Sequence, residues 1–150
     1  MPLWQWVVDI VVVLLVVLVL YGLALVVRRR LLSREGGTFE LSYRARSSRI
    51  GRGWVLGLGR YAGDELQWFR IFSLSPRPGR VWKRSGLSFE GRREPVGHEE
   101  LALYAEHVIV VLREGQVDLE LALGPASLVG FQSWLESAPP GTDWDRDRLR

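Results

Sequence analysis

The sequence contains no cysteine. This absence excludes disulfides, thiolate metal sites and a cysteine nucleophile. The chain also lacks the GxSxG pattern of serine hydrolases and the glycine-rich phosphate-binding loop of nucleotide hydrolases, and neither histidine stands beside a plausible nucleophile. We therefore expect no catalytic residues, no cofactor and no enzymatic activity.

Histidine is scarce, with two residues in the whole chain. His98 and His107 have neither the i, i+4 spacing of a helical metal site nor a companion motif. The acids Glu99 and Glu100 are adjacent, so their side chains would not share a face. We predict that these four residues lie in surface loops and that the chain has no metal site.

Basic residues are missing from the first 27 positions, and residues 10–27 carry no charge of either sign. An α-helix of that length rises about 27 Å, which is close to the hydrocarbon thickness of a bilayer. The sequence therefore predicts one transmembrane helix that spans about 7–27, inside a membrane anchor at 1–32.

Three arginines, Arg28, Arg29 and Arg30, follow the apolar run directly. The positive-inside rule then predicts that the amino terminus faces outward and that the remaining chain is cytoplasmic. Trp4 and Trp6 would lie at the outer interface, where indole rings settle at headgroup depth. We expect a single-pass protein of the plasma (inner) membrane, with its anchor uncleaved because no basic segment precedes the apolar run.

After a hinge at 33–37, apolar and polar residues alternate with a period of two, which is typical of half-buried strands. About seven strands are expected, at 39–46, 54–61, 65–73, 80–83, 86–93, 107–112 and 117–123. Gly57 and Gly59 indicate strong bending or a close backbone approach. Arg70 interrupts an apolar strand, so it either has a buried acidic partner or marks a sheet edge.

The chain after residue 93 contains loops and one helix. Residues 95–100 are predicted to form a loop, and 101–105 either a helical turn or irregular chain. Gly124-Pro125 suits a helix start, and the apolar stripe of Leu128, Phe131 and Leu135 predicts a helix at 125–138. The charged tail at 139–150 is expected to be disordered.

Two packed antiparallel sheets, with the C-terminal helix over an open end, would bury every apolar stripe. We therefore predict an N-terminal transmembrane helix followed by a mainly-β domain at 38–138. The number and order of its elements resemble a pleckstrin-homology-like sandwich or barrel.

Four stretches of the chain carry a further resemblance: the valine-rich run followed by RRR, EGGTFELSYR, RGWVLGLGRYAGDELQWFRIFSLSPRP and VDLELALGPASLVGFQSWLESAPPG. They resemble an uncharacterised family of actinobacterial single-span membrane proteins, the domain of unknown function 2550, over nearly the whole chain. The resemblance implies one amino-terminal span, a cytoplasmic domain and genes that commonly lie beside those of the ATP synthase. It implies no catalytic residues.

Positive charge gathers near the membrane anchor, because residues 28–60 hold nine arginines against two glutamates, a balance of +7. The first candidate site lies on the first strand and the loop after it, at Arg44, Arg46, Arg49 and Arg52. In pleckstrin-homology-like domains this loop often grips anionic lipid headgroups, and guanidinium groups suit phosphate geometry. The alternative is a set of solvated charges beside the membrane.

A second basic set consists of Arg77, Arg80, Lys83 and Arg84, with Trp82 among them. It predicts either a loop that dips into the membrane interface or a core tryptophan with solvated neighbours. Basic residues interleaved with an aromatic can also bind nucleic acid. We expect no nucleic-acid partner, because the domain is tethered and residues 101–150 hold eight acids against four arginines.

The leading hypothesis is a non-enzymatic, membrane-anchored interaction domain on the cytoplasmic face that binds anionic lipid headgroups or a protein partner. The alternative is an accessory or assembly factor for a membrane complex, such as the ATP synthase, that contacts the complex through the span.

Overall fold

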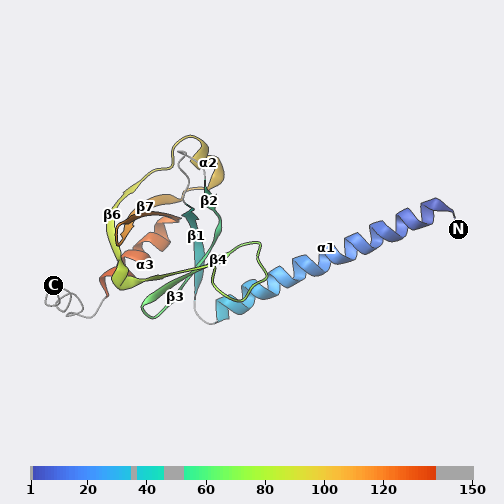
Figure 1. Ribbon diagram of the computed structural model, residues 1–150, viewed down its shortest axis with the longest axis horizontal. Coiled ribbons are helices and arrows are strands. Elements are labelled where there is room, and N and C mark those ends of the chain that lie inside the picture. Colours follow the sequence, from blue (N-terminus) through green and yellow to red (C-terminus); the bar gives the residue numbers. More distant parts are fainter. Residues whose placement is uncertain (1, 35–36, 46–52, 138–150) are drawn as a thin grey trace.

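The computed structural model describes residues 2–34, 37–45 and 53–137 (Figure 1). Three of the predicted lipid-binding residues, Arg46, Arg49 and Arg52, lie outside the described residues. Part of the predicted hinge and the predicted disordered tail at 139–150 also lie outside them.

The first element is a single long helix, α1 (Leu3–Arg34). Its 32 residues correspond to about 48 Å of rise, which exceeds the roughly 30 Å of a bilayer core. Its most apolar 18-residue window has a mean hydropathy of 3.4, and none of that window is buried. The helix is therefore long and apolar enough to cross a membrane, and it continues through the basic flank into the predicted hinge.

The rest of the chain is mainly β structure. Its strands are β1 (Thr38–Arg44), β2 (Trp54–Val55), β3 (Gly57–Ala62), β4 (Glu65–Arg70), β5 (Arg80–Lys83), β6 (Leu87–Arg93), β7 (Val108–Glu114) and β8 (Val117–Leu123). All neighbours pair antiparallel in one sheet with the order β5-β4-β3-β1-β8-β7-β6, and β2 pairs with β1 beside this path. This eight-stranded sheet is not closed, and it confirms the predicted mainly-β class.

Strand β1 joins the two halves of the sheet. It pairs with β3 through Glu40↔Leu58 and with β8 through Leu41↔Leu123. Side chains from both halves meet in one core, where all members are at most 4% exposed: Leu41, Leu66, Trp68, Trp82, Val110, Leu112, Leu121, Leu123, Leu128 and Phe131. Trp82 is thus a core residue, as one of the two interpretations of the second basic set expected.

The predicted C-terminal helix is α3 (Pro125–Glu136), which begins at a proline as expected. Its stripe of Leu128 and Phe131 is buried in the common core. The Trp134 Nε1 donates a hydrogen bond of 2.9 Å to the Gly63 carbonyl in the turn between β3 and β4. The helix is therefore fastened to both halves of the molecule, and it covers the core as predicted (Figure 1).

The third predicted strand is shorter than expected. β4 ends at Arg70, because its last pair with β3 is Gly57↔Arg70 and its pairing with β5 begins at Trp68↔Arg80. The intervening residues 71–79 leave the sheet as a loop, and Phe72 is 71% exposed. Arg70 is exposed at the end of the strand, so it requires no buried acidic partner.

The stretches on both sides of β6 contain short helices. A short 3₁₀ helix, η1 (Arg84–Gly86), precedes β6, and the helix α2 (His98–Ala102) follows β6. The predicted loop at 95–100 therefore already contains the start of a helix. The surface assignment was wrong for two residues, since Glu99 is 1% exposed and His107 is 6% exposed. His98 and Glu100 are exposed, as predicted.

Candidate functional site

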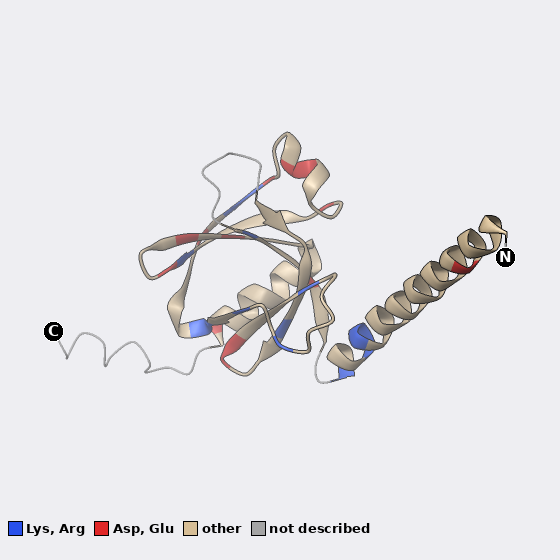
Figure 2. Cartoon of the chain, turned by 45° about the vertical axis from the view of Figure 1, so that its right-hand side comes forward, with Lys and Arg blue, Asp and Glu red and all other residues tan. Residues whose placement is uncertain are grey.

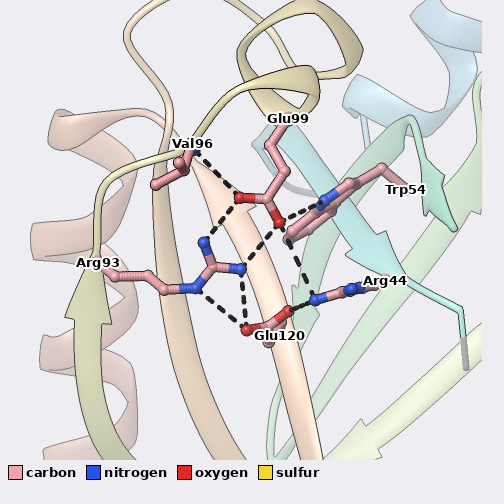
Figure 3. Close-up of polar contacts among 6 residues, drawn as sticks. All are labelled: Arg44, Trp54, Arg93, Val96, Glu99 and Glu120. Carbon is pink, nitrogen blue, oxygen red and sulfur yellow. Dashed lines mark hydrogen bonds and ion pairs between the residues drawn. The ribbon is translucent and has the colours of Figure 1, made fainter. Parts of the chain in front are cut away.

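Arg44, the described member of the first predicted site, belongs to a network of four charged side chains (Figure 3). Its Nη1 lies 2.7 Å from the Glu120 Oε2 on β8. Arg93, at the end of β6, donates to Glu120 at 3.0 Å and to both oxygens of Glu99 at 2.7 and 2.9 Å. Two arginines and two glutamates thus join strands β1, β6 and β8 to helix α2.

Glu99 is the buried centre of this network. Its carboxylate also accepts hydrogen bonds from the Trp54 Nε1 at 3.3 Å and from the Val96 backbone N–H at 3.2 Å (Figure 3). The Arg93 hydrogen bond lowers the pKa of Glu99 to about 2, although burial acts in the opposite direction. The same ion pairs raise the pKa of Arg93. Glu99 is therefore charged at neutral pH, and loss of its charge would leave a buried ion pair with Arg93 broken.

The network changes the interpretation of Arg44. Its side chain is 18% exposed, and its charge is compensated by Glu120 within the protein. A lipid phosphate would have to compete with that carboxylate for the guanidinium. No local sequence pattern marks the pair of Arg44 and Glu120, because the two residues lie 76 positions apart.

Arg84, in the second predicted site, is also bound within the protein. Its guanidinium contacts the Asp64 carboxylate, donates to the Ser137 Oγ at 2.9 Å and lies 5.5 Å above the centre of the Trp134 ring. Arg80 stacks on Tyr43, with 5.4 Å between its guanidinium carbon and the ring centre, while Lys83 is exposed. The second basic set is therefore not one surface loop: Arg84 links η1 to α3, and Arg80 and Lys83 lie on the edge strand β5.

A different basic site forms where α1 meets the loop at 71–79. A groove of about 680 Å³, which we call the helix–loop groove, lies between them. Apolar residues and three arginines line it, the latter being Arg28, Arg34 and Arg60. Figure 2 shows basic segments at the carboxyl end of α1 and on the loop beside it. The groove thus combines an apolar wall with positive charge.

Arg28 fastens the loop to the helix. Its Nε donates to the Ser75 carbonyl at 2.9 Å and its Nη1 to the Arg70 carbonyl at 3.2 Å. These acceptors are neutral carbonyls, so neither hydrogen bond compensates the positive charge of Arg28. A second groove, of about 470 Å³, lies on the other side of the loop and is lined by Arg28, Arg70 and Arg77 among others.

Neither groove has an aspartate or glutamate among its lining residues in the described part of the chain. Clustered positive charge without acids attracts anions, and the effect is largest where low-dielectric walls limit screening. The sequence analysis placed Arg28 beside the membrane but did not connect it with Arg60. Only the fold brings these residues, 32 positions apart, to one groove.

Metal binding finds no support in the described residues, since no three His, Asp or Glu side chains come together there in a way that could hold an ion. His107, one of the two histidines of the predicted surface group, instead lies beside Glu40, with 3.5 Å between its Nε2 and the Glu40 Oε2. Burial lowers the pKa of His107, and the nearby Glu40 carboxylate acts in the opposite direction.

The chain matches a known protein family. Residues 14–141 match the family described as "Protein of unknown function (DUF2550)". The chain is similar to "Uncharacterized protein Rv1312" of Mycobacterium tuberculosis (strain ATCC 25618 / H37Rv), with 40% identity over 132 residues that cover 85% of this chain and 88% of the relative.

A second relative is "Uncharacterized protein ML1147" of Mycobacterium leprae (strain TN), which is 37% identical over 110 residues, or 71% of this chain and 74% of the relative. No solved structure matches the chain. The resemblance seen in the sequence is thereby confirmed at the level of the family. The match over most of its length shows that the chain belongs to the DUF2550 family.

Proposed function

We propose that the protein is a non-enzymatic, single-pass membrane protein whose cytoplasmic β domain binds anionic lipid headgroups beside its own transmembrane helix. The helix–loop groove is the observation that carries this proposal. It is lined by arginines and apolar side chains, and it lies at the end of α1 that the positive-inside rule assigns to the cytoplasm.

The length and composition of α1 support the membrane anchor. The apolar window is exposed along its whole length, so its side chains need another apolar environment. With α1 across the bilayer of the plasma (inner) membrane, Arg28 to Arg34 lie at the cytoplasmic interface. There each basic residue contributes about 1 kcal/mol of attraction to anionic lipid.

The chemistry of the groove suits a phospholipid. Guanidinium groups of Arg28, Arg34 and Arg60 match the geometry of a phosphate, and Ala24, Val27 and Leu31 offer an apolar wall for the first part of an acyl chain. Arg60 is held in place by a hydrogen bond of 2.7 Å to the Gln67 Oε1 and by stacking on Phe69. A prepositioned side chain loses less conformational entropy on binding.

The domain architecture is compatible with this role. One sheet with the order β5-β4-β3-β1-β8-β7-β6 and a C-terminal helix on its core supports a pleckstrin-homology-like arrangement. Arg46, Arg49 and Arg52 follow β1 in the sequence, at the position where such domains often bind headgroups. These three arginines remain a second candidate contact with the membrane.

Lipid retention provides the test. The full chain would be placed in nanodiscs with equal amounts of phosphatidylglycerol and phosphatidylcholine, and the lipids that stay bound after detergent release would be measured by mass spectrometry. We expect enrichment of phosphatidylglycerol. The double variant Arg34→Gln/Arg60→Gln should weaken the preference by roughly fivefold for each lost charge.

Arg113→Gln is the matched control, because Arg113 is about half exposed on β7 and is not among the residues that line either groove. It should keep the preference for phosphatidylglycerol. Equal retention of both lipids by the wild-type chain would contradict the proposal, as would equal losses in the double variant and the control.

A protein partner is the second candidate. The unburied apolar window of α1 favours it, because this surface can also pack against another span, as expected for an accessory or assembly factor. The edge strands β5 and β6 could also pair with a peptide. Crosslinking in native membranes should recover a partner that disappears when α1 is replaced by an unrelated span. A partner that persists through the replacement would contradict contact through the span.

A further inference from the structure

The loop at 71–79 carries exposed apolar side chains at its tip. Phe72 is 71% exposed and Leu74 is 48% exposed, although the strand that precedes them contributes Leu66, Trp68 and Phe69 to the buried interior. The loop leaves the sheet and lies beside α1 (Figure 1). Together they form a small exposed apolar patch on the loop, and such a patch suits contact with a membrane or another protein.

Three hydrogen bonds fix this loop against α1. The Tyr21 hydroxyl donates to the Phe72 carbonyl at 2.9 Å. Arg28, seven residues further along the helix, donates to the carbonyls of Ser75 and Arg70. Phe72, in the tip of the loop, is therefore attached to the apolar part of α1. Arg70 and Ser75, on either side of the tip, are attached to the basic end of α1.

The attachment sets the depth of the loop in the membrane. Tyr21 belongs to the uncharged run, and its Cα lies about 10 Å from that of Arg28 along the helix axis. When Arg28 lies at the level of the lipid headgroups, Tyr21 lies deeper in the membrane. The Phe72 carbonyl is hydrogen-bonded to the Tyr21 side chain, so it also lies deeper than the headgroups. This depth corresponds to the boundary between headgroups and acyl chains, where interfacial apolar residues are buried by about 5–10 Å.

We propose that the tip of this loop is a second membrane contact, in which Phe72 and Leu74 insert into the cytoplasmic leaflet beside α1. The inference rests on the proposed span of α1. Arg70 and Arg77, both exposed, flank the tip and would remain at the level of the phosphates. The lipid bilayer is the occupant that the geometry selects, because the loop is fixed to the helix at a membrane depth.

Insertion of the loop adds a contact away from the helix axis, and it would thereby hold the helix–loop groove open toward the leaflet. With the loop inserted, the small domain keeps its basic residues at the membrane surface.

Site-directed fluorescence tests the insertion, and the absence of native cysteine makes single labels possible. Phe72→Cys, Phe89→Cys and Val16→Cys would each be labelled with an environment-sensitive NBD probe in the full chain, reconstituted in phosphatidylcholine vesicles with and without phosphatidylglycerol. Quenching by doxyl-labelled phospholipid and by aqueous iodide would then be compared. Phe89 is the matched control, since it is 42% exposed on β6, away from α1 (Figure 1).

We expect the probe at Phe72 to be quenched by the doxyl lipid and shielded severalfold from iodide relative to the probe at Phe89. This shielding should persist without phosphatidylglycerol, because insertion depends on apolar side chains. Iodide quenching at Phe72 equal to that at Phe89, with Val16 shielded, would overturn the insertion but not the span. Iodide access at Val16 as well would overturn both the insertion and the proposed membrane anchor.

Discussion

Removal of the buried charge of Glu99 should destabilise the β domain strongly. The variant Glu99→Gln keeps the size of the side chain but deletes the charge that holds Arg93 by two hydrogen bonds of 2.7 and 2.9 Å. It also leaves Arg93 with Glu120 as its remaining acidic partner in the network. Glu100→Gln is the matched control, because Glu100 is the next residue of α2 and is exposed.

The magnitude follows from the pKa of Glu99. Its lowering from 4.5 to about 2 corresponds to roughly 3 kcal/mol at 1.36 kcal/mol per pKa unit. Arg93 is 34% exposed, and solvent at that side of the pair reduces the figure to about 2 kcal/mol. For a domain of this size, such a loss lowers the melting temperature by about 8–16 °C. The control should stay within about 0.5 kcal/mol of the wild type.

The dependence on pH has a definite sign. Because the pKa of Glu99 is lowered on folding, its contribution is complete above pH 4.5 and is lost as the pH falls toward about 2. Urea unfolding of the full chain in detergent, followed by tryptophan fluorescence, measures the effect, and Trp54 reports directly because it contacts Glu99. Equal stability of Glu99→Gln and wild type at pH 7, or a difference that persists unchanged at pH 2, would refute the reasoning.

Two further predictions concern the core. Burial lowers the pKa of His107, so stability should fall as the pH drops below 6.5, and His107→Gln should abolish this slope in unfolding measurements between pH 5 and 8. A slope that survives the substitution would contradict this role. A Cβ at Gly57 would overlap the buried Trp68 ring, so Gly57→Ala should reduce the free energy of unfolding by about 1–3 kcal/mol. Gly86→Ala, which meets open space, should be neutral, and equal losses in both variants would refute the steric explanation.

Much of the fold could be predicted from local pattern. The alternation of Val117, Leu119 and Leu121 with acids gave strand β8, and the turn before it gave the β7–β8 hairpin, whose pairing runs without a break from Val108↔Leu123 to Glu114↔Val117. The glycines of β3 were predicted to mark strong bending or a close backbone approach, and the close approach is found at Gly57, where an added Cβ would lie 2.5 Å from the Phe69 carbonyl oxygen. These features depend on neighbours along the chain, so the sequence carries them directly.

Two errors have a common physical cause. The apolar segment that includes Phe72 was predicted to continue the strand, because local composition cannot show where a strand loses its pairing partners. Glu99 was predicted to be exposed, because a charged residue is seldom buried without a partner, and its partner Arg93 becomes one only when α2 folds back on β6. Both outcomes depend on contacts between segments.

The candidate site divides in the same way. The sequence by itself determined that an uncharged apolar run is followed directly by arginines. Both the hydrophobicity of the run and the placement of charge are local properties of the chain. Only the tertiary structure decided which arginines pair with acids and which line a groove. Arg44 and Arg84 are bound to acids brought to them by the fold, whereas Arg28 and Arg60 meet at a groove without acidic residues among those described. Charge compensation depends on distances of a few ångströms between remote segments, and these distances exist only after the sheet and the helices have packed.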